Sequence, residues 1–203
     1  MTTLQRMSFA DLMLQPEDGC LHELVRGEIL HMPPPKGEHG TLEARLVEAI
    51  GRYLYRQAEA LGWSESQGFS ARDLLVGRVD SGEAGIRFSL PDDPDQVRGL
   101  DICYLTPEQV ARHHTAGSNE YIPEVPALVA EVISASESAA YIDEKVRDYL
   151  AGGAQVVWLL FPKTRTAQIH RPRQSILSLT GSDSLDGTPA LADFALALDA
   201  LFS

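Results

Sequence analysis

The chain has 203 residues, of which 44% are hydrophobic and 23% charged, and its formal net charge at pH 7 is −12. This length and composition are ordinary for one globular domain with its own core, so we expect a single domain over residues 1–203. The acidic balance disfavours a general nucleic-acid binder, because such proteins hold phosphates with clustered lysine and arginine.

Several classes of protein are disfavoured by what the sequence lacks. No stretch approaches the roughly 18 apolar residues of a membrane span, and the N-terminal segment has no apolar run typical of a signal peptide. Cys20 and Cys103 lie far apart without a C-x-x-C pattern, which argues against a zinc knuckle or a disulfide framework and suits a reducing compartment. We therefore expect a cytoplasmic protein without a membrane partner.

The first third of the chain predicts a short helix, a hairpin and a long helix. Residues 8–15 have the apolar spacing of a short amphipathic helix, and HELVRGEILHM alternates around Arg26-Gly27 as a β-hairpin does. The segment MPPPKGEHG is a rigid proline-rich turn that leads into a helix over residues 39–61, which Gly62 ends. Apolar residues at helical spacing indicate that helix; they are Leu42, Leu46, Ile50, Tyr53, Leu54 and Leu61.

The rest of the chain alternates strands with helices and loops. Strands are expected over residues 63–71, 86–90, 100–105, 126–134 and 154–162, and helices over 106–114 and 138–150. TAQIHRP and SILSLT read as an antiparallel edge, PDDPDQ as a polar loop and PALADFALALDALF as a short C-terminal element. Central apolar strands flanked by two substantial helices predict a mixed α/β sandwich. No glycine-rich loop follows a strand, so neither a dinucleotide-binding fold nor a P-loop enzyme is expected.

Two carboxylates stand inside apolar strands. Glu131 lies in the middle of PALVAEVIS, and Asp101 lies in LDICYL. A charged group in such a strand costs several kcal/mol unless it is paired or binds a metal. Alternate residues of a strand share a face, so Asp101 and Glu131 would converge on one point if their strands were neighbours. Two carboxylates there would suit a hard divalent cation.

The helix after Glu131 adds a lysine to these acids. Ile142, Val146 and Tyr149 mark its buried face, and Lys145 lies inside that arc. Each residue also has an ordinary structural interpretation: a strand acid at an edge or paired with arginine, and a lysine that reaches solvent along its own stem. Two acids in separate apolar strands together with an inward lysine favour a metal site.

The sequence resembles a known family over nearly its whole length. The matching segments are HELVRGEI, MPPPKGEHG, GLDICYL, PALVAEVISASES, DEKVRDYLAGGAQVVWLLFP and ALADFALALDALF. They are similar to the Uma-type restriction endonuclease branch of the PD-(D/E)xK nuclease superfamily. This resemblance implies an α/β fold with a restriction-endonuclease-like mixed central sheet, flanked by helices and preceded by a β-hairpin. It also implies cleavage of phosphodiester bonds of DNA with Mg²⁺ or Mn²⁺.

The sequence departs from the superfamily pattern at two positions. Leu100 stands where proline usually precedes the aspartate, and Ile133 stands where the lysine of the E-x-K motif would be. The resemblance to the Uma-type branch implies that this lysine comes from the following helix, and Lys145 is the matching position. The resemblance thus assigns the metal to Asp101, Glu131 and the backbone carbonyl of Val132. Lys145 would orient or deprotonate the attacking water, or stabilise developing negative charge.

Three further residues are candidates for the same site. Glu28 follows the hairpin turn and either reaches the cleft or is a solvated acid, and Glu23 is a weaker candidate of the same kind. His39 begins the long helix on its core side. It could bind phosphate, ligate the metal through a water molecule, or only cap or pack the helix.

The scarcity of basic residues leaves alternatives to a DNA endonuclease. Lys163, Arg165, Arg171 and Arg173 form a local basic cluster in the sequence, and a homodimer would bring two such patches to one duplex. A catalytically inactive or repurposed nuclease fold that serves as a binding or assembly module is the main alternative. A metal-dependent hydrolase of small phosphorylated substrates is another.

Overall fold

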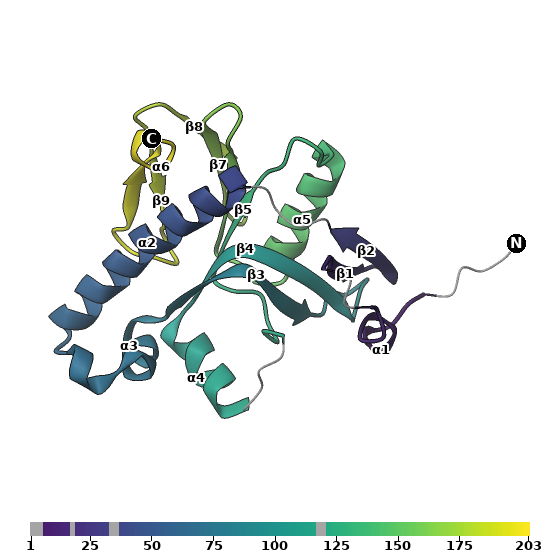
Figure 1. The fold of residues 1–203 in the computed structure, drawn as a ribbon, viewed down its shortest axis with the longest axis horizontal. Coiled ribbons are helices and arrows are strands. Elements are labelled where there is room, and N and C mark those ends of the chain that lie inside the picture. The colour runs from purple at the N-terminus through teal and green to yellow at the C-terminus, as the bar shows by residue number, and fades with distance from the viewer. Residues whose placement is uncertain (1–5, 17–18, 33–36, 117–120) are drawn as a thin grey trace, which may run out of the picture.

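A twisted central β-sheet with helices on both faces dominates the molecule (Figure 1). The structure, a computed structural model, describes residues 6–16, 19–32, 37–116 and 121–203. Its main sheet has eight strands in the order β2-β1-β4-β5-β6-β7-β8, with β3 paired to β4 beside this path. The strands are β1 (Leu21–Val25), β2 (Glu28–Met32), β3 (Arg78–Phe88), β4 (Gln96–Leu105), β5 (Leu128–Val132), β6 (Val156–Phe161), β7 (Thr166–His170) and β8 (Leu177–Thr180). Only β5 and β6 pair in parallel within this sheet of described residues, which confirms the predicted mixed α/β architecture.

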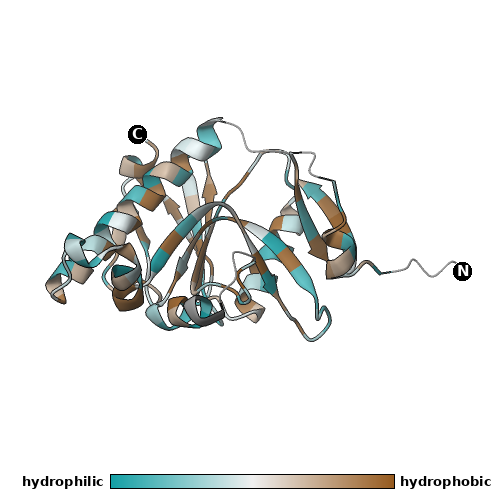
Figure 2. Ribbon diagram, turned by 60° about the horizontal axis from the view of Figure 1, so that its bottom comes forward, coloured by the Kyte–Doolittle hydropathy of each residue, from teal (hydrophilic) through white to brown (hydrophobic). Residues whose placement is uncertain are grey.

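One face of the sheet is covered by the long helix α2 (Gly37–Ala60). Its buried residues recur mostly every fourth position and pack against Trp158 and neighbouring strand residues; they are Leu42, Leu46, Ile50, Leu54 and Ala58. The predicted helix over residues 39–61 is confirmed. The C-terminal part, a small sheet of β9 (Ser184–Asp186) and β10 (Ala195–Ala197) followed by α6 (Leu198–Leu201), joins the same core. Figure 2 shows the hydrophobic residues concentrated along the central strands.

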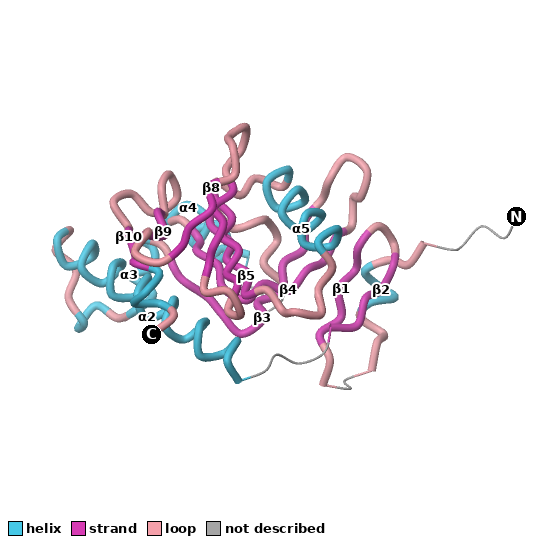
Figure 3. The backbone as a smooth tube through the Cα atoms, turned by 90° about the horizontal axis from the view of Figure 1, so that it is seen from above, coloured by secondary structure: helices cyan, strands magenta, loops and turns pink. Residues whose placement is uncertain are grey.

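The opposite face is covered by α5 (Ala139–Ala151), as the view from above shows (Figure 3). Ser138 begins the helix, because its side chain accepts a hydrogen bond from the Tyr141 N–H. Val146 and Tyr149 pack on residues of β5 and β6 in a second apolar cluster. The buried face of α5 also carries Lys145 and Asp148, so this side of the core contains charge.

The N-terminal hairpin forms as the sequence predicts. Arg26 and Gly27 both have positive φ, 50° and 78°, which is the conformation of a tight two-residue turn that matches strand twist. The hairpin joins the edge of β4 through Leu24 opposite Val97. The predicted helix over 8–15 is shorter, with α1 limited to Phe9–Leu12. Residues 33–36 of the proline-rich turn lie outside the described residues.

The strand expected over residues 63–71 is wrong. The chain there forms a 3₁₀ helix, η1 (Glu65–Gln67), and then α3 (Phe69–Val76). Trp63 is buried, but its indole N–H donates to the carbonyl of Gly68 at 3.1 Å, so the segment folds back on itself instead of pairing with a strand. The expected strand over 86–90 is the end of β3, and the short helix after β4 is α4 (Pro107–Ala116).

Candidate active site

The two strand acids predicted from the sequence lie where β4 and β5 separate. Antiparallel pairing runs from Tyr104 opposite Leu128 to Ile102 opposite Ala130. One step further, the Asp101 carboxylate accepts the backbone N–H of Val132 at 2.6 Å. The Asp101 side chain thus accepts the Val132 N–H, which a backbone carbonyl of β4 would accept if the strand pairing continued. The two strands diverge at Asp101 and Glu131.

Glu131 is held by two donors from α5. Its side chain is buried, and one carboxylate oxygen lies 2.8 Å from Lys145 Nζ while the other accepts the Tyr149 hydroxyl at 2.8 Å. Residues four apart share one face of a helix, so α5 presents Lys145 and Tyr149 together. Burial, together with the charge of Asp101, raises the pKa of Glu131 to about 7, against the opposing effect of Lys145. The Lys145 ammonium therefore supports the ionised form of this carboxylate.

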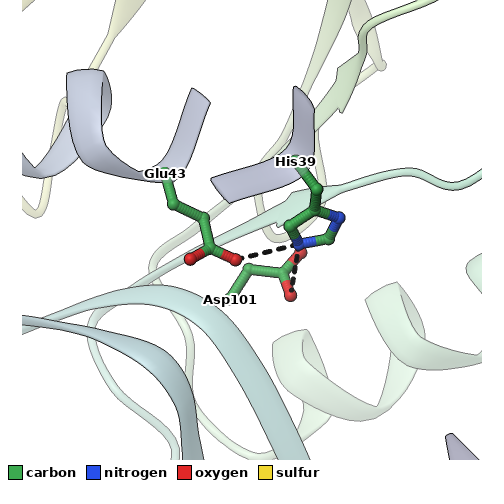
Figure 4. Close-up of side chains that lie close together, drawn as sticks. All are labelled: His39, Glu43 and Asp101. Atoms are coloured by element: carbon green, nitrogen blue, oxygen red, sulfur yellow. Dashed lines mark ion pairs between the residues drawn. The ribbon is translucent and has the colours of Figure 1, made fainter. Parts of the chain in front are cut away.

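The opposite side of the site comes from the first turns of α2. His39 Nε2 lies 2.9 Å from Glu43 Oε1 and 3.0 Å from Asp101 Oδ1, as Figure 4 shows. Burial lowers the pKa of His39, but the carboxylates of Asp101, Glu43 and Glu131 outweigh it, and the net shift is upward. The site therefore joins both helical layers through the point where the sheet opens.

The donor atoms of His39, Glu43 and Asp101 fit a divalent cation. They all lie within 4.8 Å of one another. His39 Nε2 is buried and close to two carboxylate oxygens, yet it is aligned with neither for a hydrogen bond. One imidazole and two carboxylates are ligands that suit Mn²⁺, and the carboxylates also suit Mg²⁺. A cation among them would offset the repulsion between the two acids.

The structure brings together most of the residues singled out in the sequence. Asp101 and His39 are in contact, and Glu131 and Lys145 are paired beside them. Val132 contributes its N–H to Asp101, whereas a role for its carbonyl stays a prediction. Glu28 is exposed at the hairpin turn, and within the described residues no hydrogen bond or ion pair joins it to the site.

Sequence reasoning missed Glu43. It lies one helical turn after His39, and the spacing H-x-x-x-E at the start of the long helix was the available signal. The signal was weak because a glutamate on a helix is usually solvated, and only the position of α2 over β4 brings Glu43 to Asp101.

A buried ionic network lies next to the site. Arg98, which is fully buried, donates to Glu23 at 3.2 Å and to Asp148 at 2.7 Å. Tyr141 donates its hydroxyl to Glu23 at 2.7 Å, and its ring centroid is 5.7 Å from Lys145 Nζ. Glu23, and not Glu28, is therefore the hairpin acid that enters the interior. The network fixes the hairpin and β4 to the helix that carries Lys145.

The hydrogen bond from Tyr149 to Glu131 should contribute measurably to stability. We expect Tyr149→Phe to lower the free energy of unfolding by about 1.5–3 kcal/mol, because a hydrogen bond to a buried carboxylate is lost. Urea denaturation of the purified protein measures this change.

Tyr55→Phe is a matched control for Tyr149→Phe. The Tyr55 hydroxyl also donates to a glutamate, Glu65, at 2.6 Å, but at an exposed position. We expect no measurable change in unfolding for this variant. Equal losses in the free energy of unfolding for the two substitutions would show that burial of Glu131 does not strengthen its hydrogen bond with Tyr149.

A family model described as "Uma2: Putative restriction endonuclease" matches residues 9–199. A solved structure described as a "putative nuclease belonging to DUF820 from Anabaena variabilis ATCC 29413" has a TM-score of 0.76 and 18% sequence identity, with 97% of each chain covered. At that identity the likeness shows the fold alone. No curated protein matches. Among the described residues, no helix combines the length and the apolar character that crossing a membrane requires.

Proposed function

The chain belongs to the Uma2 family, whose description is "Putative restriction endonuclease". On this basis we propose that it hydrolyses phosphodiester bonds of DNA with a divalent metal ion. The observation that carries this proposal is the convergence of His39, Glu43 and Asp101 within 4.8 Å, beside the buried pair of Glu131 and Lys145. Such a group of acids, an imidazole and an ammonium suits a reaction at a phosphate.

Mg²⁺ or Mn²⁺ is the cofactor that these ligands suit. When bound, such an ion supplies Lewis acidity that lowers the pKa of a water molecule and neutralises charge on the scissile phosphate. His39, Glu43 and Asp101 would hold it, and Glu131 and the carbonyl of Val132 are the further ligands proposed from the sequence. Because both Glu131 oxygens already accept hydrogen bonds, Glu131 would also anchor Lys145.

Lys145 is proposed to act as a charged group. Burial lowers its pKa, but the neighbouring Glu131 carboxylate outweighs this effect and holds the pKa well above its usual value. A lysine that stays protonated at neutral pH cannot accept a proton from water. Of the roles considered for Lys145, orienting the attacking water and stabilising negative charge on the phosphate are therefore favoured.

Metal binding by Glu43 provides a test of this function. We expect Glu43→Gln to weaken Mn²⁺ binding at least tenfold by titration calorimetry, and to weaken cleavage of plasmid DNA after EDTA treatment and return of Mn²⁺. Glu59→Gln is the matched control, because it removes an exposed glutamate from the same helix. Wild-type protein that binds no Mn²⁺, or a Glu43→Gln variant that binds it as tightly as wild type, would contradict the proposal.

Two other functions are compatible with the same fold and predict different results in these assays. A repurposed binding or assembly module, which the net charge of −12 favours, would show no metal-dependent cleavage. A hydrolase of small phosphorylated substrates would cleave a generic phosphodiester and leave DNA intact.

A cytoplasmic location and a homodimer remain part of the proposal, and sedimentation of the purified protein tests the dimer.

A further inference from the structure

Most basic side chains of the described residues face a carboxylate. Ion pairs account for Arg6, Arg26, Arg52, Arg72, Arg78, Arg87, Arg98, Arg112, Lys145, Arg147 and Arg171. Within the described part of the chain, the lysines and arginines outside these ion pairs are Arg45, Arg56, Lys163, Arg165 and Arg173. Acidic residues outnumber basic ones in this protein, 29 to 17, so a lysine or arginine without an acidic partner is unexpected and is available to bind an external anion.

Four of these five cations line one groove. The groove consists of three successive hollows of about 490, 300 and 280 Å³ between α2 and the C-terminal part of the chain. The first two share Arg52, and the second and third share Arg45, so they follow one another along the helix. Figure 1 shows α6 beside α2, and the two helices are in contact.

The three arginines of α2 form a line along the groove. Arg45, Arg52 and Arg56 are seven and four residues apart, which places them on one face of the helix. At a rise of 1.5 Å per residue, the line from Arg45 to Arg56 is about 17 Å long. Cations arranged in a row suit a chain of anions better than a single small anion, which would need them around one point.

The groove is positively charged although the protein is acidic. Its lining contains five basic residues and three acids, Glu38, Glu48 and Asp193. Arg45 donates to the carbonyl of Leu201 at 3.0 Å, and Arg165 donates to the carbonyl of Phe202 at 2.6 Å. These bonds fix both guanidinium groups at the wall and leave their charge without a counter-ion from the protein.

One end of the groove lies at the candidate active site. β5 and β6 are parallel, with Val132 opposite Leu160, so the turn after β6 leaves the sheet at the same end as Glu131. That turn carries Lys163 and Arg165, which line the third hollow together with Glu38. Glu38 directly precedes His39 on α2. A ligand in the groove would therefore extend away from the site.

We propose that this groove binds the phosphate backbone of the DNA whose scissile bond lies in the site. The inference rests on the proposed function and adds to it the path of the substrate. Phosphates of one DNA strand are about 3.4 Å apart along the helix axis, so a 17 Å row of cations spans roughly five of them. Arg171 and Arg173 lie outside this path. Arg171 pairs with Asp186, and Arg173 follows β7 at the opposite end of the sheet from Lys163.

Binding of a fluorescein-labelled DNA duplex in EDTA, followed by anisotropy at several salt concentrations, tests the groove. The informative variant is Arg56→Gln/Lys163→Gln, because both side chains are exposed and neither is in an ion pair. Each lost phosphate contact removes about 0.9 from the slope of log K against log salt. We expect a slope smaller by about 1.8 and, near 0.1 M salt, binding weaker on the order of 50-fold.

Two control variants separate charge from fold and from position. Arg56→Lys/Lys163→Arg keeps both charges and should bind DNA as wild type does. Arg173→Gln removes a cation that also lacks an acidic partner, but outside the groove, and should leave the salt slope unchanged.

The outcomes distinguish the groove from the proposed function. If Arg56→Gln/Lys163→Gln binds DNA with the wild-type slope, or if wild-type protein binds anionic lipid vesicles and no DNA, the groove inference is overturned. Weaker DNA binding by this variant supports the groove even if no metal-dependent cleavage is found, in which case only the proposed function fails.

Discussion

Asp101→Asn should reduce metal-dependent cleavage of DNA by at least about a thousandfold, which corresponds to the several kcal/mol that a metal ion contributes to such a reaction. Asp101 contacts His39 and bridges β4 to the N–H of Val132. An asparagine has the same shape, and its amide oxygen still accepts the Val132 N–H, so the strands should stay in place. What the substitution removes is the negative charge that the cation requires. Initial rates on plasmid DNA with Mg²⁺ or Mn²⁺ measure the effect.

A second aspartate offers a matched control for Asp101→Asn. Asp183 also accepts a backbone N–H, from Thr180 at 2.8 Å, but it lies in an exposed turn near the C-terminal part of the chain. Asp183→Asn should cleave at the wild-type rate. If Asp101→Asn cleaves as fast as Asp183→Asn while both remain folded, Asp101 does not belong to the active site.

Arg98→Met should have the largest effect on stability, a loss of about 3–5 kcal/mol in the free energy of unfolding. Arg98 is fully buried between the carboxylates of Glu23 and Asp148. Its removal leaves the Glu23 carboxylate without its cation. Asp148 keeps Arg26 as a cation and the Gln96 amide as a hydrogen-bond donor. Desolvated charge without a partner is costly, which is why the expected loss exceeds that of an ordinary ion pair. Urea denaturation with calorimetry as a second measurement gives the value.

The expected loss for Arg98→Met has two checks. Arg147→Met breaks an exposed pair with Asp143 on α5 and should change stability very little, because surface ion pairs contribute little. Arg98→Met/Glu23→Gln removes the uncompensated charge along with the arginine and should recover part of the loss. A double variant as unstable as the sum of its single variants would indicate that lost packing, and not the buried Glu23 charge, causes the effect.

The core of the site was predictable because strand periodicity constrains it. Asp101 and Glu131 interrupt apolar strands, and the alternation of side chains places both at the divergence of β4 and β5. The position of Lys145 followed from the helical spacing around Tyr149, and the structure pairs it with Glu131 at 2.8 Å. Local patterns also predicted the hairpin, since Arg26-Gly27 is a short turn between alternating segments.

Other features depend on contacts between distant segments and leave little trace in local sequence. Glu43 reaches the site only because α2 crosses β4. Glu23 can be buried only because it forms an ion pair with Arg98 of β4. The turn around Trp63 resembled a strand because its closure depends on a bond to the Gly68 carbonyl. The basic groove combines α2 with the turn after β6. The basic cluster around Lys163 in the sequence indicated the residues of the turn but not the arginines of α2.

The position of a bound cation decides whether His39, Glu43 and Asp101 form the metal centre. The most direct measurement is anomalous diffraction from a crystal of the protein soaked with Mn²⁺. We expect one strong peak within coordination distance of His39 Nε2 and of a carboxylate oxygen from both Glu43 and Asp101, with Lys145 still paired to Glu131. A peak at another location, or none among these three side chains at saturating Mn²⁺, would contradict the assignment of this site.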